Sequence, residues 1–207
     1  MAGYVADSSN LPGEAQAVSR PRDERELALV CRACFRAGIP VTLSGGRSNL
    51  TGSATPRGGV VLSLARMAGP DIDLDCEART VQAPVGMIVE DLRARVLDLS
   101  GGKLAFPVDP TSRTDASIGG ALACNASGFT PGEKGAIRHW VDAIDFLLPN
   151  GFKLSARRRQ YVSEGGLFRL QPPRGLPIDR DEWPVPRHPR AAIKNAGGPF
   201  SAEDGVL

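Results

Sequence analysis

A glycine-rich segment at residues 42–59, TLSGGRSNLTGSATPRGG, carries the residue types that bind anions. It holds five glycines, three serines, three threonines and two arginines. Backbone N–H groups in a tight glycine-rich turn form a concave anion site. Side chains add further donors, and the candidate binding residues are Ser44, Gly45, Gly46, Arg47, Ser48 and Asn49. A pyrophosphate group fits this chemistry.

The spacing in this segment differs from that of the two better-known phosphate loops. A P-loop requires G-x-x-x-x-G-K-[ST], whereas five residues separate Gly46 from Gly52 and a serine follows. A Rossmann fingerprint opens a helix, whereas this loop leads through Pro56 into an apolar, strand-like run. Taken alone, the segment could also be a surface loop without a ligand.

A second segment at residues 106–128, FPVDPTSRTDASIGGALACNASG, repeats the same chemistry. Its prolines stiffen the chain, and its two adjacent glycines allow the backbone to approach a ligand closely. Asparagine both donates and accepts hydrogen bonds. The candidate residues here are Pro107, Asp109, Pro110, Thr111, Ser112, Thr114, Ser117, Ile118, Gly119, Gly120, Asn125 and Gly128.

The elements that position these segments alternate between helix and strand. Periodicity predicts a helix over residues 21–37, with Leu27, Cys34 and Phe35 on one face, and Gly38 after its end. Strands are expected at 39–43, 59–64, 71–75 and 80–86, and a hairpin at 141–155. An amphipathic helix is expected at 87–99, with Ile88, Leu92 and Val96 inward. The fold class is α+β (mixed α/β).

With both motifs in order, the chain resembles the FAD-binding domain of the vanillyl-alcohol oxidase/PCMH superfamily. More narrowly, it resembles the FAD-linked 2-hydroxy-acid dehydrogenases of the D-lactate dehydrogenase and glycolate oxidase subunit group. The matching pieces are AGIPVTLSGGRSNLTGSATPRGGVVLSLARM, FPVDPTSRTDASIGGALACNASG and VDAIDFLLPNG, with a looser match at IKNAGG. The resemblance implies a PCMH-type fold of two α+β subdomains, truncated at its C-terminus.

The resemblance implies FAD as the cofactor, held between the two subdomains. Residues 44–49 would surround the pyrophosphate, and residues 107–120 would follow the ribityl chain and the isoalloxazine. Asn125 and Gly128 would lie near the flavin, and the backbone of Ile144 would lie at the adenine. One covalent branch of the superfamily has a flavin-linked histidine where this chain has Arg47, and residues 105–120 contain no cysteine or histidine. The expectation is therefore non-covalent FAD.

The expected division is an N-terminal extension at 1–20, the FAD-binding domain at 21–156, and a Pro/Arg-rich segment with an incomplete remainder of that domain at 157–207. In relatives, the substrate groups come mainly from a C-terminal cap domain. The implied function is the FAD-binding portion of a flavin-dependent oxidoreductase, whose 2-hydroxy-acid substrate requires a cap or a partner subunit. The alternatives are an inactive FAD-binding fragment, an enolpyruvyl-sugar-reductase-like flavoprotein, or an interaction module using the Pro/Arg-rich tail.

Composition narrows the remaining classes of function. The net charge of +2 predicts no nucleic-acid partner, and no apolar run suggests a membrane span or a secretory signal. Four cysteines fit a reducing compartment, so a cytoplasmic location is expected. Cys31 and Cys34 form a C-x-x-C, but their helical spacing favours core positions over a metal site. His139 is interpreted as structural, and no catalytic residue is assigned.

Overall fold

The computed structural model describes residues 2–130, 133–162, 164, 167–169 and 182–184. Its first half is built on a parallel sheet with the order β1-β3-β2. The strands are β1 (Ala17–Ser19), β2 (Val41–Ser44) and β3 (Val60–Ser63). Because β2 and β3 run parallel, the glycine-rich segment leaves the carboxyl end of β2 and crosses to the amino ends of the strands, where β3 begins.

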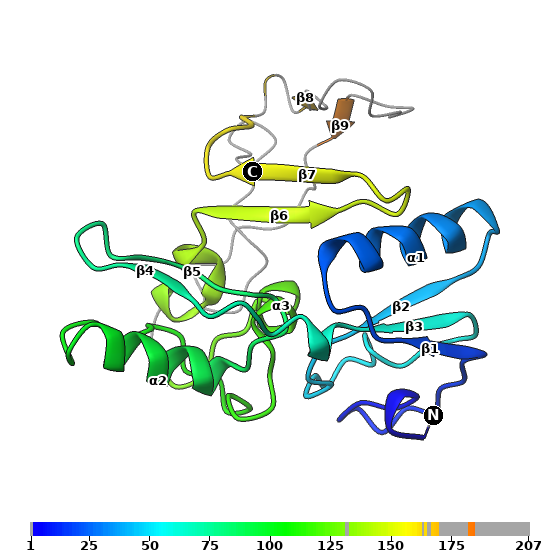
Figure 1. Cartoon of the computed structure of the whole chain (residues 1–207), viewed down its shortest axis with the longest axis horizontal. Helices are drawn as coiled ribbons and strands as arrows, with labels where there is room; N and C mark the ends of the chain where they lie inside the picture. Colours follow the sequence, from blue (N-terminus) through cyan, green and yellow to red (C-terminus); the bar gives the residue numbers. More distant parts are fainter. Residues whose placement is uncertain (1, 131–132, 163, 165–166, 170–181, 185–207) are drawn as a thin grey trace.

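Helix α1 (Glu24–Arg36) covers one face of this sheet (Figure 1). It starts three residues later than predicted, because the Asp23 side chain accepts the Glu26 N–H at 2.8 Å and so caps the helix. Gly38, with a φ of +64°, ends it as expected. Leu27 packs against the sheet in the core. Phe35 was expected inward but is 60% exposed, because it lies at the margin of the buried stripe.

The second half lies beside this sheet (Figure 1) and packs around two further apolar clusters, which include Val89 and Leu92. Its elements are the antiparallel strands β4 (Asp73–Asp75) and β5 (Thr80–Gln82), with helices α2 (Val89–Leu99) and α3 (Ile118–Ala123). Leu92 and Val96 of α2 are buried as predicted. Ile88, also expected inward, is the N-cap residue and only half-buried; Val89, 1% exposed, takes the inward place.

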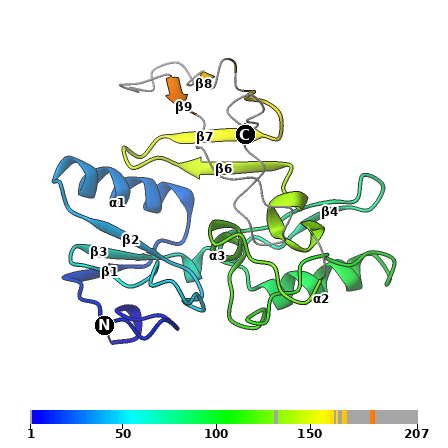
Figure 2. The same ribbon diagram turned by 180° about the vertical axis from the view of Figure 1, so that it is seen from behind.

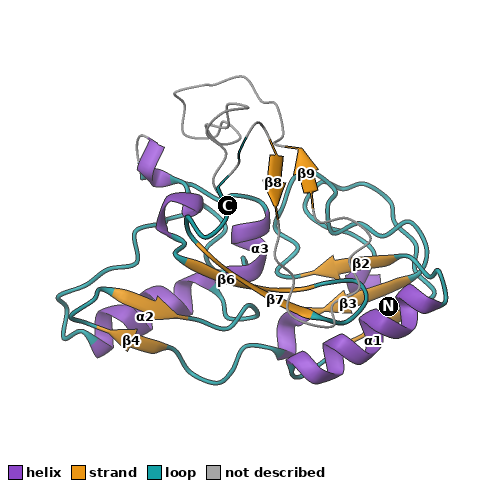
Figure 3. Ribbon diagram, turned by 90° about the horizontal axis from the view of Figure 1, so that it is seen from above, coloured by secondary structure: helices purple, strands orange, loops and turns teal. Residues whose placement is uncertain are grey.

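A long hairpin runs above α3, from the side of α2 towards α1 (Figures 1 and 3). Its strands are β6 (Ala143–Leu147) and β7 (Lys153–Arg157), joined by the predicted turn with Gly151 at a φ of +84°. The Lys153 ammonium lies 3.1 Å from the Glu24 carboxylate, so the hairpin is tied to the start of α1. Leu147 packs against the α1–β3 core.

Short elements complete the described chain. The 3-10 helices are η1 (Ala2–Tyr4), η2 (Leu64–Arg66), η3 (Glu133–Gly135) and η4 (Ile137–Trp140), and strands β8 (Leu167–Arg169) and β9 (Glu182–Pro184) pair antiparallel. The Pro/Arg-rich tail and the IKNAGG match lie mostly or wholly outside the described residues. Within the described part, no helix has the length and apolarity needed to cross a bilayer.

The first residues of the chain belong to the folded structure. β1 lies within residues 1–20 and pairs in parallel with β3, so the expected N-terminal extension contributes a strand to the sheet. Residues before β1 pass below the sheet, on the side opposite α1 (Figures 1 and 2). This path brings them to the glycine-rich segment.

Candidate functional site

The glycine-rich segment begins at a buried serine. Ser44, at the carboxyl end of β2, is 0% exposed. The five residues that follow it are half-buried, so they are partly open to solvent. Leu50, which comes next, is 78% exposed. The candidate binding residues therefore lie at the surface, directly after a rigid strand.

The backbone N–H groups of residues 45–49 form a row of unused donors. Among the described residues, none of these five N–H groups donates a hydrogen bond to a protein acceptor. Arg47 has a φ of +57°, in the left-handed region. A left-handed residue beside ordinary ones turns successive N–H groups into a shared concavity for an anion. The predicted anion loop thus has free backbone donors available.

The side chain of Asn49 supports the exit of this loop. Its Oδ1 accepts hydrogen bonds from the backbone N–H of Thr51 at 3.1 Å and of Ser53 at 3.2 Å. This Asx-type turn bends the chain at the end of the row of donors. The side-chain oxygen of Asn49 is therefore committed to the loop, and its amide NH₂ interacts with the carboxylate of Asp7, whose pKa it helps to lower.

The two motifs predicted from sequence are in direct contact. A Cβ atom at Gly46 would overlap the carbonyl oxygen of Asp115 and lie 3.0 Å from the Cα of Ala116. A Cβ atom at Gly45 would overlap Oγ of Ser117. The sequence suggested that these glycines leave space for a ligand. In the structure this space is filled by residues 115–117 of the second segment, so the two motifs lie at one site.

The N-terminus of α3 is fixed by protein contacts. Ser117 is 3% exposed, and its Oγ accepts the N–H of Gly120 at 3.2 Å. The N–H groups of Ile118 and Gly119 donate to the carbonyls of Met87 and Val85 at 2.8 and 2.9 Å. The N–H groups of Ile118, Gly119 and Gly120 thus have acceptors within the protein, and a place for these residues beside a cofactor stays a prediction.

Asp109 lies in a cluster of alternating charges. Its Oδ1 is 3.1 Å from Nη1 of Arg113 and 3.8 Å from Nη1 of Arg93. Arg113 also reaches Glu90 on α2, at 2.8 Å. Arg93 donates to the Val108 carbonyl at 3.2 Å. This cluster, residues 90, 93, 109 and 113, ties the second segment to α2.

The backbone after α3 returns to the same place. Phe129 donates its N–H to the carbonyl of Asp109 at 3.0 Å, and Asp109 and Gly128 form an isolated parallel bridge. Gly128 has a φ of +106°, and a Cβ there would overlap the Asp109 carbonyl. Pro107 accepts the Thr130 hydroxyl at 3.0 Å. The structure thus places Pro107, Asp109 and Gly128 side by side.

The remaining candidates are distributed around this core. Thr111 and Thr114 are exposed on the turn that follows the buried Pro110. Asn125 has a φ of +48°, and its buried Oδ1 has no hydrogen-bond partner among the described residues. Ile144 lies on β6, opposite Ala156 of β7, and its place at an adenine stays a prediction.

Sequence reasoning missed the N-terminal residues at this site. The ring of Tyr4 lies 5.0 Å from the guanidinium carbon of Arg47, and the Ser8 N–H donates to the Arg47 carbonyl at 3.1 Å. Asp7 is 8% exposed and accepts the Ala54 N–H at 3.1 Å. These contacts join residues far apart in the chain, and DSSN gave only a local turn signal.

The cysteines are separate from the site. All four are free, and Cys34 is 5% exposed in the face of α1 that packs on the sheet. Burial is the main cause that raises the pKa of the Cys31 thiol, with the neighbouring Cys34 adding to it. Among the described residues, no cluster of histidine, cysteine and carboxylate side chains could hold a metal ion.

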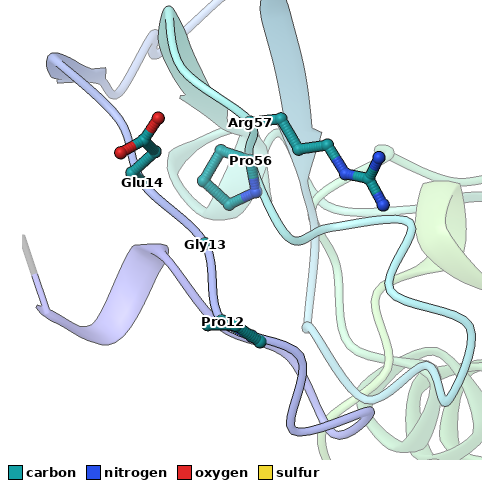
Figure 4. Close-up of a pocket in the computed structure, with 5 residues that line it drawn as sticks. All are labelled: Pro12, Gly13, Glu14, Pro56 and Arg57. Carbon is teal, nitrogen blue, oxygen red and sulfur yellow. The ribbon is translucent and has the colours of Figure 1, made fainter.

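A shallow hollow lies on the outer side of the N-terminal residues (Figure 4). It is lined by Pro12, Gly13, Glu14, Pro56 and Arg57. Figure 4 shows the side chains of Glu14 and Arg57 pointing away from each other, so they form no paired site there. None of the residues predicted to bind a cofactor lines this hollow.

The site has the chemistry that a dinucleotide pyrophosphate requires. Free N–H groups and the Arg47 guanidinium supply donors and positive charge, and the second motif lies against them. The buried Oδ1 of Asn125 is a further polar atom awaiting a donor. The residues present therefore fit an FAD molecule with its pyrophosphate at residues 45–49.

Comparisons with known proteins agree with this geometry. Residues 15–155 match the family described as FAD binding domain, so the chain belongs to that family. The chain is 35% identical over 148 residues to the D-lactate dehydrogenase of Anaerostipes hadrus, covering 70% of this chain and 30% of that protein. It is 32% identical over 136 residues to the D-2-hydroxyglutarate dehydrogenase of Xanthomonas citri pv. viticola, covering 65% of this chain and 28% of that protein.

Solved structures show the same fold. The xylooligosaccharide oxidase from Myceliophthora thermophila C1 superposes with a TM-score of 0.63 at 20% identity, covering 74% of this chain and 32% of that one. The 6-hydroxy-D-nicotine oxidase from Arthrobacter nicotinovorans superposes with a TM-score of 0.61 at 18% identity, covering 75% and 33%. The predicted α+β, PCMH-type fold is confirmed, and the cofactor of the family is FAD.

Proposed function

We propose that this chain binds FAD non-covalently and forms the FAD-binding part of an oxidoreductase that oxidises a 2-hydroxy acid, such as D-lactate or glycolate. The observation that carries the proposal is the row of unused N–H donors at residues 45–49, held against the second motif. The substrate class is supported by the relatives named D-lactate dehydrogenase, D-2-hydroxyglutarate dehydrogenase and glycolate oxidase subunit.

In this proposal the glycine-rich loop binds the pyrophosphate. Hydrogen bonds to a charged group contribute about 1.5–3 kcal/mol each, so several N–H donors acting together hold the cofactor firmly. The Arg47 guanidinium, which donates to Ser44 Oγ at 3.4 Å, adds a positive charge beside the donors. Ser48 and the backbone N–H of Asn49 complete the polar lining.

The second motif would shape the space for the flavin end. Residues 107–120 are held rigidly by the charge cluster, the Asp109–Gly128 bridge and the cap of α3. Of this motif, Pro107, Thr111, Thr114 and the side chain of Asn125 are the groups proposed to line the ribityl chain and ring. Ile144 is proposed to meet the adenine through its backbone.

The absence of histidine and cysteine from residues 42–59 and from residues 105–120 supports non-covalent binding. Arg47 occupies the loop position where a covalent branch has histidine, and a guanidinium forms no such bond. Residues 105–120 contain no cysteine or histidine. The cofactor would then be released intact when the protein unfolds.

The bound flavin would supply an acceptor for the hydride that leaves the α-carbon of the substrate. The residues described in this chain bind and orient that cofactor, and none is proposed as the base for the hydroxyl proton. The chain spans about 30% of the length of the curated relatives it matches. Substrate groups are therefore proposed to come from protein outside the matched region, in a cap or in a partner subunit.

The test uses the full chain. The protein is incubated with FAD and desalted, and its flavin absorption is measured; acid precipitation then shows whether the flavin stays with the pellet. The proposal predicts retained flavin that is released into the supernatant. No retained flavin would overturn FAD binding, and flavin in the pellet would overturn the non-covalent assignment.

Substrate and electron flow are tested on the loaded protein. D-lactate, glycolate and D-2-hydroxyglutarate are offered with an artificial electron acceptor, and NADPH is offered as a reductant. Bleaching of the flavin by a 2-hydroxy acid supports the proposed activity. Bleaching by NADPH alone would favour the reductase alternative, and a flavin that stays oxidised throughout would leave this chain as a cofactor-binding part without activity of its own.

A further inference from the structure

The N-terminal brace, defined as residues 4–10, lies directly on the glycine-rich loop. It contacts the loop at both ends through three kinds of interaction: an aromatic ring, backbone hydrogen bonds and a buried carboxylate. Nothing in the sequence motifs of the site includes these residues. The brace therefore needs an explanation of its own.

The first contact sets the position of a side chain. The Tyr4 ring, half-buried, lies 5.0 Å from the guanidinium carbon of Arg47, and the same guanidinium donates to Oγ of the fully buried Ser44. An arginine over an aromatic face within about 6 Å is attracted to it. Tyr4 and Ser44 together hold the guanidinium beside the carboxyl end of β2.

The second contact sets the backbone of the same residue. Both the N–H and the hydroxyl of Ser8 donate to the carbonyl of Arg47, at 3.1 and 3.3 Å. Arg47 is in the left-handed region, at a φ of +57°, which costs a residue with a Cβ about 1–2 kcal/mol. The two bonds from Ser8 offset this cost and keep the turn that makes the N–H groups converge.

The third contact ties the brace to the far end of the loop. Asp7, 8% exposed, accepts hydrogen bonds from the Ser9 N–H at 2.9 Å and from the Ala54 N–H at 3.1 Å. Gly13, just after the brace, allows the chain to pack on Thr55 and Pro56, which a Cβ at Gly13 would meet at 2.7 and 2.9 Å. The brace thus contacts the loop at residues 47 and 54, and Gly13 continues the packing to residue 56.

We infer that the N-terminal brace is part of the cofactor site, in which Tyr4 and Ser8 position Arg47 so that its charge and its N–H group face the pyrophosphate. This inference rests on the proposed function. Tyr4 and Ser8 are positioning residues, since they act through Arg47 and are not proposed to touch the cofactor. Asp7 anchors the brace to the loop by accepting the Ala54 N–H.

The test is a double-substitution cycle on FAD affinity in the full chain. Tyr4→Leu removes the ring, and Arg47→Gly removes the side chain at a position whose φ suits glycine. FAD affinity is measured by fluorescence titration at several NaCl concentrations. Tyr4→Leu is expected to weaken binding about two- to fivefold. It is also expected to flatten the salt dependence, because a misplaced Arg47 no longer contributes its charge.

Three comparisons separate positioning from a general structural role. Tyr4→Phe keeps the ring and is expected to restore affinity. Phe35→Leu is the control: it makes the same aromatic-to-leucine change at an exposed side chain of α1, away from the brace. In the Arg47→Gly background, Tyr4→Leu is expected to have no further effect, because the group it positions is gone.

The outcomes are distinguishable from failure of the proposed function. Wild-type affinity and salt dependence in Tyr4→Leu would overturn the inference while FAD binding stands. A Tyr4→Leu effect that persists undiminished in the Arg47→Gly background would also overturn it. Failure of the wild-type chain to bind FAD would overturn the proposed function and this inference with it.

Discussion

Gly46 lies so close to Asp115 that a Cβ atom on Gly46 would overlap the Asp115 carbonyl oxygen. This contact joins the loop after β2 to the turn before α3. The two segments supply different parts of the candidate site, so the contact sets their relative position. Glycine at residue 46 is therefore required by the protein itself, before any cofactor binds.

Substituting Gly46 tests this contact. Gly46→Ala is expected to push the loop away from residues 115–116 and to weaken FAD binding by about tenfold or more. The double change Gly45→Val with Gly46→Val is expected to abolish flavin retention. Gly3→Ala serves as the control, since a Cβ at Gly3 meets nothing within 4 Å. Unchanged FAD affinity in Gly46→Ala would show that the loop assignment is mistaken.

The charge cluster around Asp109 is expected to contribute both to FAD binding and to the stability of the fold. Arg113→Met removes contacts to Glu90 and Asp109 and should lower the free energy of unfolding by about 1 kcal/mol or less, because these side chains are partly solvated. Arg95→Met is the matched control: Arg95 pairs with Asp71 and Asp98, at similar exposure.

Thermal unfolding and FAD titration separate the two variants. Both should lose a similar amount of stability, whereas only Arg113→Met should weaken FAD binding, because Arg113, unlike Arg95, holds the second motif to α2. Equal FAD affinities in the two variants would contradict a role of the cluster in shaping the site.

Asp7 makes stability depend on pH at the acid end. Burial acts to raise its pKa, but hydrogen bonds from the Ser9 side chain, the Ser9 backbone and the Ala54 backbone outweigh it and lower the pKa from 3.8 to about 2. Since the folded-state pKa is depressed, the stabilisation is fully present above pH 3.8 and is lost as the pH falls towards about 2.

Denaturation of Asp7→Asn against wild type measures this effect. The variant should be about 1–2 kcal/mol less stable at neutral pH, and the difference should shrink as the pH falls through that window. Asp73→Asn, an exposed carboxylate on β4, controls for charge removal. A difference that stays constant down to the lowest pH would show that the carboxylate charge of Asp7 is not what stabilises the brace.

The cap of α3 gives a further prediction. Ser117→Ala removes the acceptor for the Gly120 N–H and should destabilise the protein by about 1 kcal/mol. Ser100→Ala is the comparison, because Ser100 is also a buried serine at a helix end, beyond α2 and away from the site. Urea denaturation of both variants should show a loss, with FAD affinity reduced only in Ser117→Ala.

Much of the fold follows from local sequence signals. The α1 helix, its end at Gly38, the strands β2 and β3 and the hairpin of β6 and β7 are each specified by residues adjacent in the chain, and the structure contains them. The parallel pairing of β2 and β3, and the strand β1 beside them, join distant residues and were not predicted. Errors arose at element ends. The helix α1 begins at Glu24 rather than at Pro21, because the Asp23 side chain caps its first turn.

The candidate site shows where sequence reasoning stops. A Cβ at Gly119 would lie 3.1 Å from Val85, a packing contact within the protein that residue type and spacing did not indicate. The contact of Asp7 with Ala54 spans 47 residues and follows no periodicity. Such contacts depend on the complete fold, so the N-terminal brace could not be inferred from residue types and spacing alone.

The most direct test of the central claim observes the five N–H groups of residues 45–49. With ¹⁵N-labelled protein, amide resonances are followed by NMR while FAD is added. Binding of the pyrophosphate at this loop predicts that these five resonances shift most, that ADP shifts the same ones, and that Gly46→Ala suppresses the shifts. Saturable FAD binding that leaves these five resonances unmoved would contradict the account.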